Sequence, residues 1–205
     1  VRLMPQMTGL TFALFVFGGL WLALWRGRVR LLGLAPVAGA TALLLATPVP
    51  DILIAGDGRN VGIAGPDVAR GEKLLMLRDT RSEFARDNLR ELTGFEGEPV
   101  PLAEWPGAEC NRDACAIALE RGGRTWRILM TRSRDYLEIG ALNAACAAAD
   151  IVISDRRLPR TCEPRWLKAD RAMLRETGGL AIVLEGQRVT TVAESQGAHG
   201  WWRAP

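Results

Sequence analysis

Two long uncharged stretches open the chain, and alternating apolar and polar positions mark much of the remainder. Residues Thr8–Trp25 and Leu31–Val49 contain no charged side chain. With a rise of about 1.5 Å per residue, a helix of either length approaches the ~30 Å hydrocarbon thickness of a bilayer. The pattern predicts two membrane-spanning helices within residues 1–50, and the alternative is a buried helical hairpin of a soluble protein. A cleaved signal peptide fits poorly because a second apolar segment comes after the first.

Residues 51–205 carry strand and helix patterns in alternation, which predicts an α/β domain with its chemistry in the loops at strand ends. Hairpins are expected across Gly122-Gly123 and across Glu185-Gly186-Gln187. Residues 94–109 have no strong pattern, and the tail 196–205 is expected to be loosely held. The predicted strands are 51–54, 60–64, 73–77, 115–120, 125–130, 151–153, 180–184 and 188–192, and the predicted helices are 82–92, 139–149 and 164–176.

The turn between the two apolar segments is rich in arginine. Its sequence, Arg26-Gly27-Arg28-Val29-Arg30, has three basic residues and no acidic one. The positive-inside rule places such a loop in the cytoplasm, and Arg2 on the other flank opposes this only weakly. Residues 51–205 would then lie on the opposite side of a bacterial inner membrane, in the periplasm or outside the cell.

Four cysteines, an even number, all come after the apolar segments. That side of the membrane permits disulfides, and four cysteines allow three pairings. Local spacing favours Cys110–Cys115 and Cys146–Cys162. A zinc site is the alternative, but the cysteines do not form paired CxxC motifs and His199 is the one histidine of the chain.

Arginines are concentrated near the ends of the predicted strands. Residues 121–175 contain twelve basic and six acidic residues, although residues 51–205 as a whole carry a net charge of −1. Guanidinium groups suit phosphate oxygens, so these loops are candidates for contact with phosphate groups. The alternative is an intramolecular network of ion pairs with Asp155, Glu163 and Asp170. The candidate phosphate contacts are Arg132, Arg134, Arg156, Arg157, Arg160, Arg165 and Lys168.

Several stretches resemble the C-terminal end of the ComEC family of competence proteins. They are the two apolar segments around the arginine turn, PDILIAGDGRNVGI, RGGRTWRILMTRS, AADIVISDRRLP and WLKADRAMLRETGGLAI. Members of this family are polytopic inner-membrane proteins that pass single-stranded DNA into the cytoplasm during transformation. The resemblance covers essentially the whole chain and implies that it is the last part of such a channel. The implied partners are single-stranded DNA, the lipid bilayer, the rest of the channel and other competence proteins.

The resemblance also implies a shortened, metallo-β-lactamase-like α/β fold for residues 51–205. Ile128–Ser133 takes the place of the LLTGD motif of the family, with Ser133 where the aspartate is expected. Ala149–Pro159 takes the place of ADVLKVGHHGS, with Arg156 and Arg157 where adjacent histidines are expected. The HxHxDH cluster has no counterpart. Because a two-metal hydrolase needs several converging imidazole and carboxylate ligands, we expect no catalytic residue, metal or cofactor here.

The sequence thus predicts a non-catalytic portion of a DNA-uptake channel, which shapes its outer mouth and contacts single-stranded DNA through arginines. Two alternatives stay open: a nuclease that uses unorthodox carboxylate ligands, and a purely structural domain that docks a partner. Gly56-Asp57-Gly58 is interpreted as a tight turn rather than a nucleotide loop. Ser133 lacks a histidine base, and Trp201-Trp202 could dock on the domain or meet lipid headgroups. The candidate nuclease ligands are Asp57, Asp79, Asp87 and Asp155.

Overall fold

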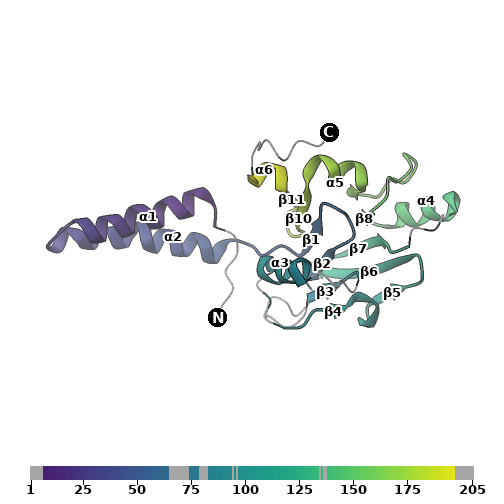
Figure 1. Ribbon diagram of the computed structural model, residues 1–205, viewed down its shortest axis with the longest axis horizontal. Helices are drawn as coiled ribbons and strands as arrows, with labels where there is room; N and C mark the ends of the chain where they lie inside the picture. The colour runs from purple at the N-terminus through teal and green to yellow at the C-terminus, as the bar shows by residue number, and fades with distance from the viewer. Residues whose placement is uncertain are drawn as a thin grey trace. The chain divides into compact units, whose positions relative to one another are not determined.

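The computed structural model describes residues 7–64, 74–78, 83–93, 95, 97–133, 135 and 138–196. The chain divides into two compact units, Val1–Val49 and Pro50–Pro205. Figure 1 shows the helices and strands of each unit. Arg134, Asp79 and His199 lie outside the described residues, as does the predicted tail beyond residue 196.

The first unit is a hairpin of apolar helices: α1 (Gly9–Leu24), the 3-10 helix η1 (Arg28–Gly33) and α2 (Leu34–Ala46). Thr8 caps α1, since its hydroxyl accepts a hydrogen bond from the N–H of Thr11. A Cβ atom built on Gly18 would lie 2.8 Å from the carbonyl oxygen of Gly33, and one on Gly33 would lie 2.8 Å from that of Gly18. The two helices therefore touch backbone to backbone at these glycines.

Both predicted apolar segments are helical, and they differ in length. Among the described helices, the stretch Arg28–Ala46 is long and apolar enough to cross a membrane, and 17% of its most apolar window is buried. Helix α1 is apolar but shorter, with 16 residues. Such low burial is unlike that of a helix in a soluble core, which agrees with a lipid environment for this stretch.

The second unit contains two sheets in its described residues (Figure 1). The first has the order β11-β10-β1-β2-β3-β4, and the second has the order β5-β6-β7-β8-β9. The strands of the first sheet are β1 (Ile52–Ala55), β2 (Val61–Ala64), β3 (Leu74–Met76), β4 (Val100–Pro101), β10 (Gly179–Val183) and β11 (Arg188–Thr191). Those of the second are β5 (Ala108–Cys110), β6 (Ala114–Arg121), β7 (Arg124–Thr131), β8 (Ile151–Ile153) and β9 (Leu167–Ala169). The predicted α/β class and both predicted hairpins, β6–β7 and β10–β11, are confirmed.

Alternate side chains of each strand point to opposite faces, and this builds the layers of the domain. Ile52 and Ile54 of β1 join Ile128 and Ile153 of the second sheet in the main core between the two sheets. Leu53, which lies between the two isoleucines, packs instead with the helix α3 (Glu83–Thr93) on the outer face of the first sheet.

The outer face of the second sheet is covered in the same way. Val152 of β8 packs with Cys146 of helix α4 (Ile139–Ala148) and with the loop that follows the strand. The four layers are therefore helix, sheet, sheet and helix. Both predicted disulfides are confirmed: Cys146–Cys162 ties α4 to that loop, and Cys110–Cys115 joins β5 to β6.

The predicted helix 164–176 is wrong in its first half. Leu167–Ala169 instead forms β9, which pairs in parallel with β8 and places Trp166 beside Trp126, with 5.1 Å between the ring centroids. The helix α5 is Arg171–Thr177, and Asp170 caps it by accepting the N–H groups of Ala172 and Met173. Packing of the aromatic ring and pairing with the sheet outweigh the helical propensity of these residues. The predicted stop is confirmed, since Gly178 ends α5 with a φ of 74°.

Four further short elements were not predicted. β4 and β5 lie in the stretch without a strong pattern, where the 3-10 helix η3 (Leu102–Glu104) separates them. Helix α6 (Val192–Gln196) begins at the residue where a strand was expected to end. The predicted helix 82–92 is confirmed as α3, and Leu89 is buried as expected. Its expected cap, Ser82, lies outside the described residues.

Helix α4 begins at a carboxylate that accepts two backbone N–H groups. The side chain of Glu138 is bonded by the N–H of Ala141 and of Gly140, and these bonds lower its pKa below the ordinary value of 4.5. A lowered pKa stabilises the folded state above the unfolded pKa, and this contribution is lost as the pH falls through the folded pKa.

We therefore expect Glu138→Gln to lower the urea midpoint slightly at about pH 7, and to have no effect well below the pKa of the carboxyl group. Glu163→Gln is the matched control, because Glu163 is exposed and has no hydrogen bond of this kind in the described part of the chain. The measurement is urea denaturation followed by circular dichroism across this pH range. A deficit that is the same at every pH would contradict the role of the charge.

Candidate phosphate-contact site at the strand ends

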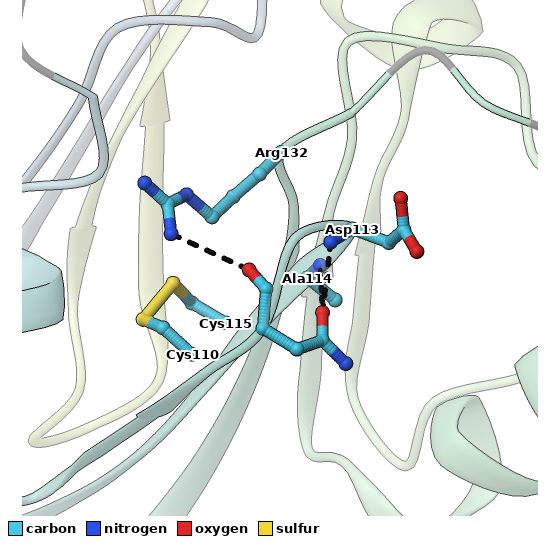
Figure 2. The surroundings of a disulfide bond; sticks show 6 residues. Cys110, Asp113, Ala114, Cys115 and Arg132 are labelled. Atoms are coloured by element: carbon cyan, nitrogen blue, oxygen red, sulfur yellow. Dashed lines mark hydrogen bonds between the residues drawn. A yellow bond between two sulfur atoms is a disulfide. The ribbon is translucent and has the colours of Figure 1, made fainter.

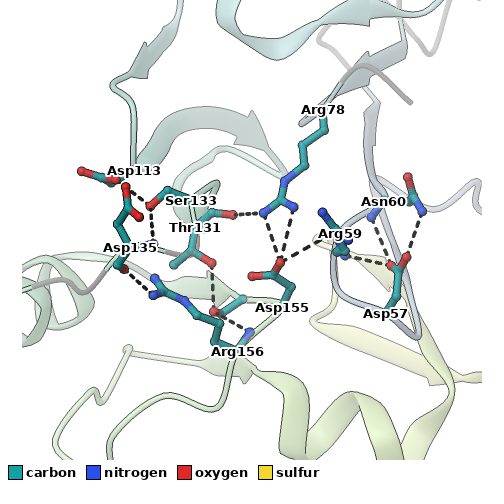
Figure 3. Close-up of polar contacts among 11 residues, drawn as sticks. Asp57, Arg59, Asn60, Arg78, Asp113, Thr131, Ser133, Asp135, Asp155 and Arg156 are labelled. Atoms are coloured by element: carbon teal, nitrogen blue, oxygen red, sulfur yellow. Dashed lines mark hydrogen bonds and ion pairs between the residues drawn. The ribbon is translucent and has the colours of Figure 1, made fainter. Parts of the chain in front are cut away.

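The parallel pairing of β7, β8 and β9 brings the ends of three strands to one edge of the second sheet. The loops that begin at Arg132, Ser154 and Asp170 therefore lie close together. From the first sheet, Arg78 at the end of β3 and Arg59 in the β1–β2 loop reach the same place (Figure 3). The site is thus assembled from both sheets.

A buried carboxylate, that of Asp155, lies at the centre of the site. Its side chain is 5% exposed, and its Oδ2 accepts hydrogen bonds of 3.3 Å from both Nη1 and Nη2 of Arg78. The Nε of Arg59 lies 3.8 Å from the same oxygen. Arg78 also donates to the carbonyl oxygen of Thr131, so one guanidinium group links the two sheets (Figure 3).

This ion pair is not fully satisfied. Within the described residues, Oδ1 of Asp155 and Nε of Arg78 are buried without a hydrogen-bond partner. Burying a charged group costs several kcal/mol, roughly, unless the opposite charge and hydrogen bonds compensate it. The pair therefore depends on both partners, because removal of either leaves an uncompensated charge.

Two buried hydroxyl groups hold the loop that follows β8. Thr131 Oγ1 and Ser154 Oγ lie 2.9 Å apart, and the Ser154 oxygen also accepts the N–H of Arg156. The N–H of Leu158 donates to Oδ2 of Asp170 over 3.1 Å. The backbone of residues 154–158 is thereby fixed, which leaves the arginine side chains to extend from a rigid loop.

The disulfide-closed turn between β5 and β6 supports the loop that follows β7. The side-chain oxygen of Asn111 accepts the N–H groups of Asp113 and Ala114, and its carbonyl accepts Nη1 of Arg132 (Figure 2). The backbone N–H of Arg132 donates to the carbonyl of Asp113 over 2.7 Å. The hydroxyl of Ser133 donates to the carboxylate of Asp113 over 2.6 Å, so it is already engaged.

The predicted arginines fall into two groups. Arg132 and Arg156 bind backbone carbonyls, those of Asn111 and Asp135 respectively. The remaining predicted contacts are Arg157, Arg160 and Arg165, which are exposed, and Lys168, which is half-buried. No ion pair or side-chain hydrogen bond of these four is found in the described part of the chain.

The alternative prediction was a set of ion pairs between these arginines and Asp155, Glu163 or Asp170. No such pair is found among the described residues. Asp155 pairs with Arg78 and Arg59 rather than with the predicted arginines. The carboxylate of Asp170 accepts hydrogen bonds from backbone N–H groups. Glu163 makes no ion pair in the described part of the chain. Among the described residues, the exposed arginines Arg157, Arg160 and Arg165 therefore have no acidic partner at short range.

The sequence patterns did not single out Arg59 and Arg78. Arg78 lies just beyond the buried strand β3. Its position at a strand end was the one feature of the sequence that could have marked it as a site residue. Arg59 lies in the predicted turn, which is confirmed: the Asp57 side chain accepts the N–H groups of Arg59 and Asn60. Gly58 has a φ of 67°, and a Cβ there would lie 2.9 Å from the carbonyl oxygen of Ser154.

The three candidate nuclease ligands that the structure describes are each engaged by other groups. Asp57 accepts a backbone N–H group within its own turn, and Asp155 pairs with Arg78. Asp87 lies 3.5 Å from Arg90 on α3. Asp79 is outside the described residues. Over the described ranges, no group of three or more His, Cys, Asp or Glu side chains could hold a metal ion.

A cavity of about 330 Å³ lies elsewhere, beside α4 over β6 and β7. Its lining is mostly alkyl, from residues such as Ala116, Ala118, Leu129 and Ala145, and its charged residues are Glu109 and Arg127. Such a surface does not suit a phosphate group, so the strand ends remain the candidate site.

Comparison of the chain with protein-family models, with curated proteins and with solved structures finds no match. A function for the chain is therefore inferred from the geometry of the site.

Proposed function

We propose that this chain is the non-catalytic C-terminal portion of a ComEC-type DNA-uptake channel in a bacterial inner membrane. In this proposal the second unit lies outside the cytoplasm and shapes the outer mouth of the channel. Its strand-end arginines contact the phosphate backbone of single-stranded DNA. The observation that carries the proposal is the group of exposed arginines without an acidic partner in the described residues, held on a loop that buried hydrogen bonds fix.

Phosphate contact would give a partner to arginines that have no acidic one among the described residues. A polyanion would supply negative charge to these arginines, and contacts to the phosphate backbone bind DNA without reading its sequence. Arg157 and Arg160 follow one another in the loop after β8, whereas Arg165 lies at the other end of this strand, where its backbone N–H donates to the carbonyl of Ala149. Arg132 and Arg156, in the loops after β7 and β8, are proposed as secondary contacts, and so is Lys168 in the middle of β9.

The central ion pair supports a domain without hydrolytic metal chemistry. In a metallo-β-lactamase-like fold the metal ions are held at strand ends between two sheets. The layers of helix, sheet, sheet and helix fit such a fold, and here the guanidinium of Arg78 is the cation that faces Asp155. A positive charge fixed on a side chain can neutralise a carboxylate, but it does not activate water as a metal ion does.

The proposed location rests on the two disulfides and on the apolar hairpin. Disulfides persist in oxidising compartments, such as the bacterial periplasm. An apolar hairpin with an arginine-rich turn would place its other end, where residue 50 begins, on the side away from the cytoplasm.

The proposal predicts weak, salt-sensitive binding of single-stranded DNA. We expect the triple variant Arg157→Gln, Arg160→Gln and Arg165→Gln to weaken binding about tenfold at roughly 50 mM NaCl. The slope of log affinity against log salt should become shallower by about 2, because three phosphate contacts are lost. The measurement is fluorescence anisotropy of a labelled oligothymidylate of about 20 nucleotides, with the full chain in detergent.

Arg188→Gln is the matched control, because this arginine is exposed on β11 and should change the affinity little. Affinity that does not respond to salt, or that survives loss of the three arginines, would count against the proposal. Stoichiometric zinc or manganese in the purified chain, together with cleavage of the oligonucleotide, would favour the nuclease instead.

A further inference from the structure

The turn of the apolar hairpin has a fixed structure. The backbone N–H of Trp25 donates to the carbonyl of Trp21 at the end of α1. The indole N–H of Trp21 reaches over the turn to the carbonyl of Val29, at 3.1 Å. The rings of Trp21 and Trp25 are stacked, with 5.0 Å between their centroids. Two tryptophans therefore brace the turn against the last turn of the helix.

Three arginines extend from this braced turn without a counter-charge. Arg26, Arg28 and Arg30 are exposed, and residues 1–50 contain no aspartate or glutamate. None of the three makes an ion pair or a side-chain hydrogen bond within the described residues. An anionic partner of these three guanidinium groups would therefore have to come from outside residues 1–50.

The surroundings of these arginines identify the kind of partner. Leu24, Trp25 and Leu32 are 76%, 51% and 64% exposed, so large apolar side chains flank the charges. Free phosphate or a nucleic acid would leave this apolar surface in contact with water. A lipid–water interface suits both the apolar and the charged side chains. Acyl chains cover the apolar residues, tryptophan lies at the headgroup level and arginine reaches the phosphates.

We propose that the turn Trp25–Arg30 is a binding site for the headgroups of anionic phospholipids. The guanidinium groups of Arg26, Arg28 and Arg30 contact lipid phosphates, and the stacked pair Trp21–Trp25 holds the turn at headgroup depth. This inference rests on membrane insertion of the hairpin, as in the proposed function, and is independent of DNA binding. Each basic residue beside a membrane is attracted to anionic lipid, so three of them should produce a measurable preference for it.

The test compares lipids retained by the full chain after reconstitution. Vesicles of phosphatidylcholine and phosphatidylglycerol at about 7:3 are dissolved in mild detergent, and the retained lipids are quantified by mass spectrometry. We expect phosphatidylglycerol to be enriched over the bulk ratio. The variant Arg26→Gln, Arg28→Gln and Arg30→Gln should reduce this enrichment at least about fivefold, and about 0.5 M NaCl should reduce it in the parent chain.

Two controls separate the possible failures. The variant Arg157→Gln, Arg160→Gln and Arg165→Gln loses the same charge in the other unit and should keep the enrichment. Replacing the three turn arginines with lysine should also keep most of it, since the charge is retained. Equal enrichment in the parent chain and the turn variant, or enrichment that salt leaves unchanged, overturns the headgroup site alone. Release of the parent chain from vesicles by alkaline carbonate overturns both membrane insertion and this site.

Discussion

Replacing Asp155 with alanine is expected to lower the free energy of unfolding by about 3–5 kcal/mol. The substitution leaves the guanidinium of Arg78, whose side chain is 18% exposed, without a charged partner. Among the described residues, Arg78 would then keep one hydrogen bond, to the carbonyl oxygen of Thr131. The unfolding free energy is measured by urea denaturation with linear extrapolation.

The double variant Asp155→Ala and Arg78→Met should recover much of this loss, because it buries no lone charge. The exposed pair of Arg112 and Asp135 is the control, since its side chains are 82% and 57% exposed. Asp135→Ala should therefore cost less than about 1 kcal/mol. If Asp155→Ala cost no more than Asp135→Ala, the central ion pair would not hold the two sheets together.

Removing the disulfide between Cys146 and Cys162 with a double serine substitution should cost about 3 kcal/mol. The bond closes a loop with a sequence separation of 16, and both cysteines are fully buried between α4 and the loop after β8. Most of the expected effect comes from the larger freedom of the unfolded chain. The same urea titration, run on oxidised protein, measures it.

The second disulfide provides an internal comparison. Cys110 and Cys115 are separated by 5 residues, so the same relation gives about 2 kcal/mol for their double serine variant. A larger loss at this short bond than at the long one would contradict the loop-entropy explanation. It would indicate instead that the turn supporting Arg132 contributes through its native contacts.

Much of the second sheet could be predicted because its signals are local. Trp126, Ile128 and Met130 alternate with more exposed residues, and the structure buries those three. Glycines at 122 and 123 have φ values of 57° and 72°, which suit the expected tight turn of the hairpin. Cysteine spacing likewise favoured the two pairings that the structure contains.

The missed features depend on contacts between distant residues. β9 has three residues, Leu167, Lys168 and Ala169, which suit a helix equally well, and only pairing with β8 makes them a strand. The bond between Arg78 and Asp155 spans 77 positions. Periodicity could locate the end of each strand, but it could not show that the ends from both sheets meet.

The contact of Gly18 with Gly33 has a consequence for the helical hairpin of the first unit. Each position lacks room for even one methyl group, since a Cβ on either glycine would meet the other's carbonyl oxygen at 2.8 Å. An acyl chain is far wider than a methyl group, so lipid cannot enter between the helices at this level. Under the proposed membrane insertion, lipids would surround the two helices as one unit and would not separate them.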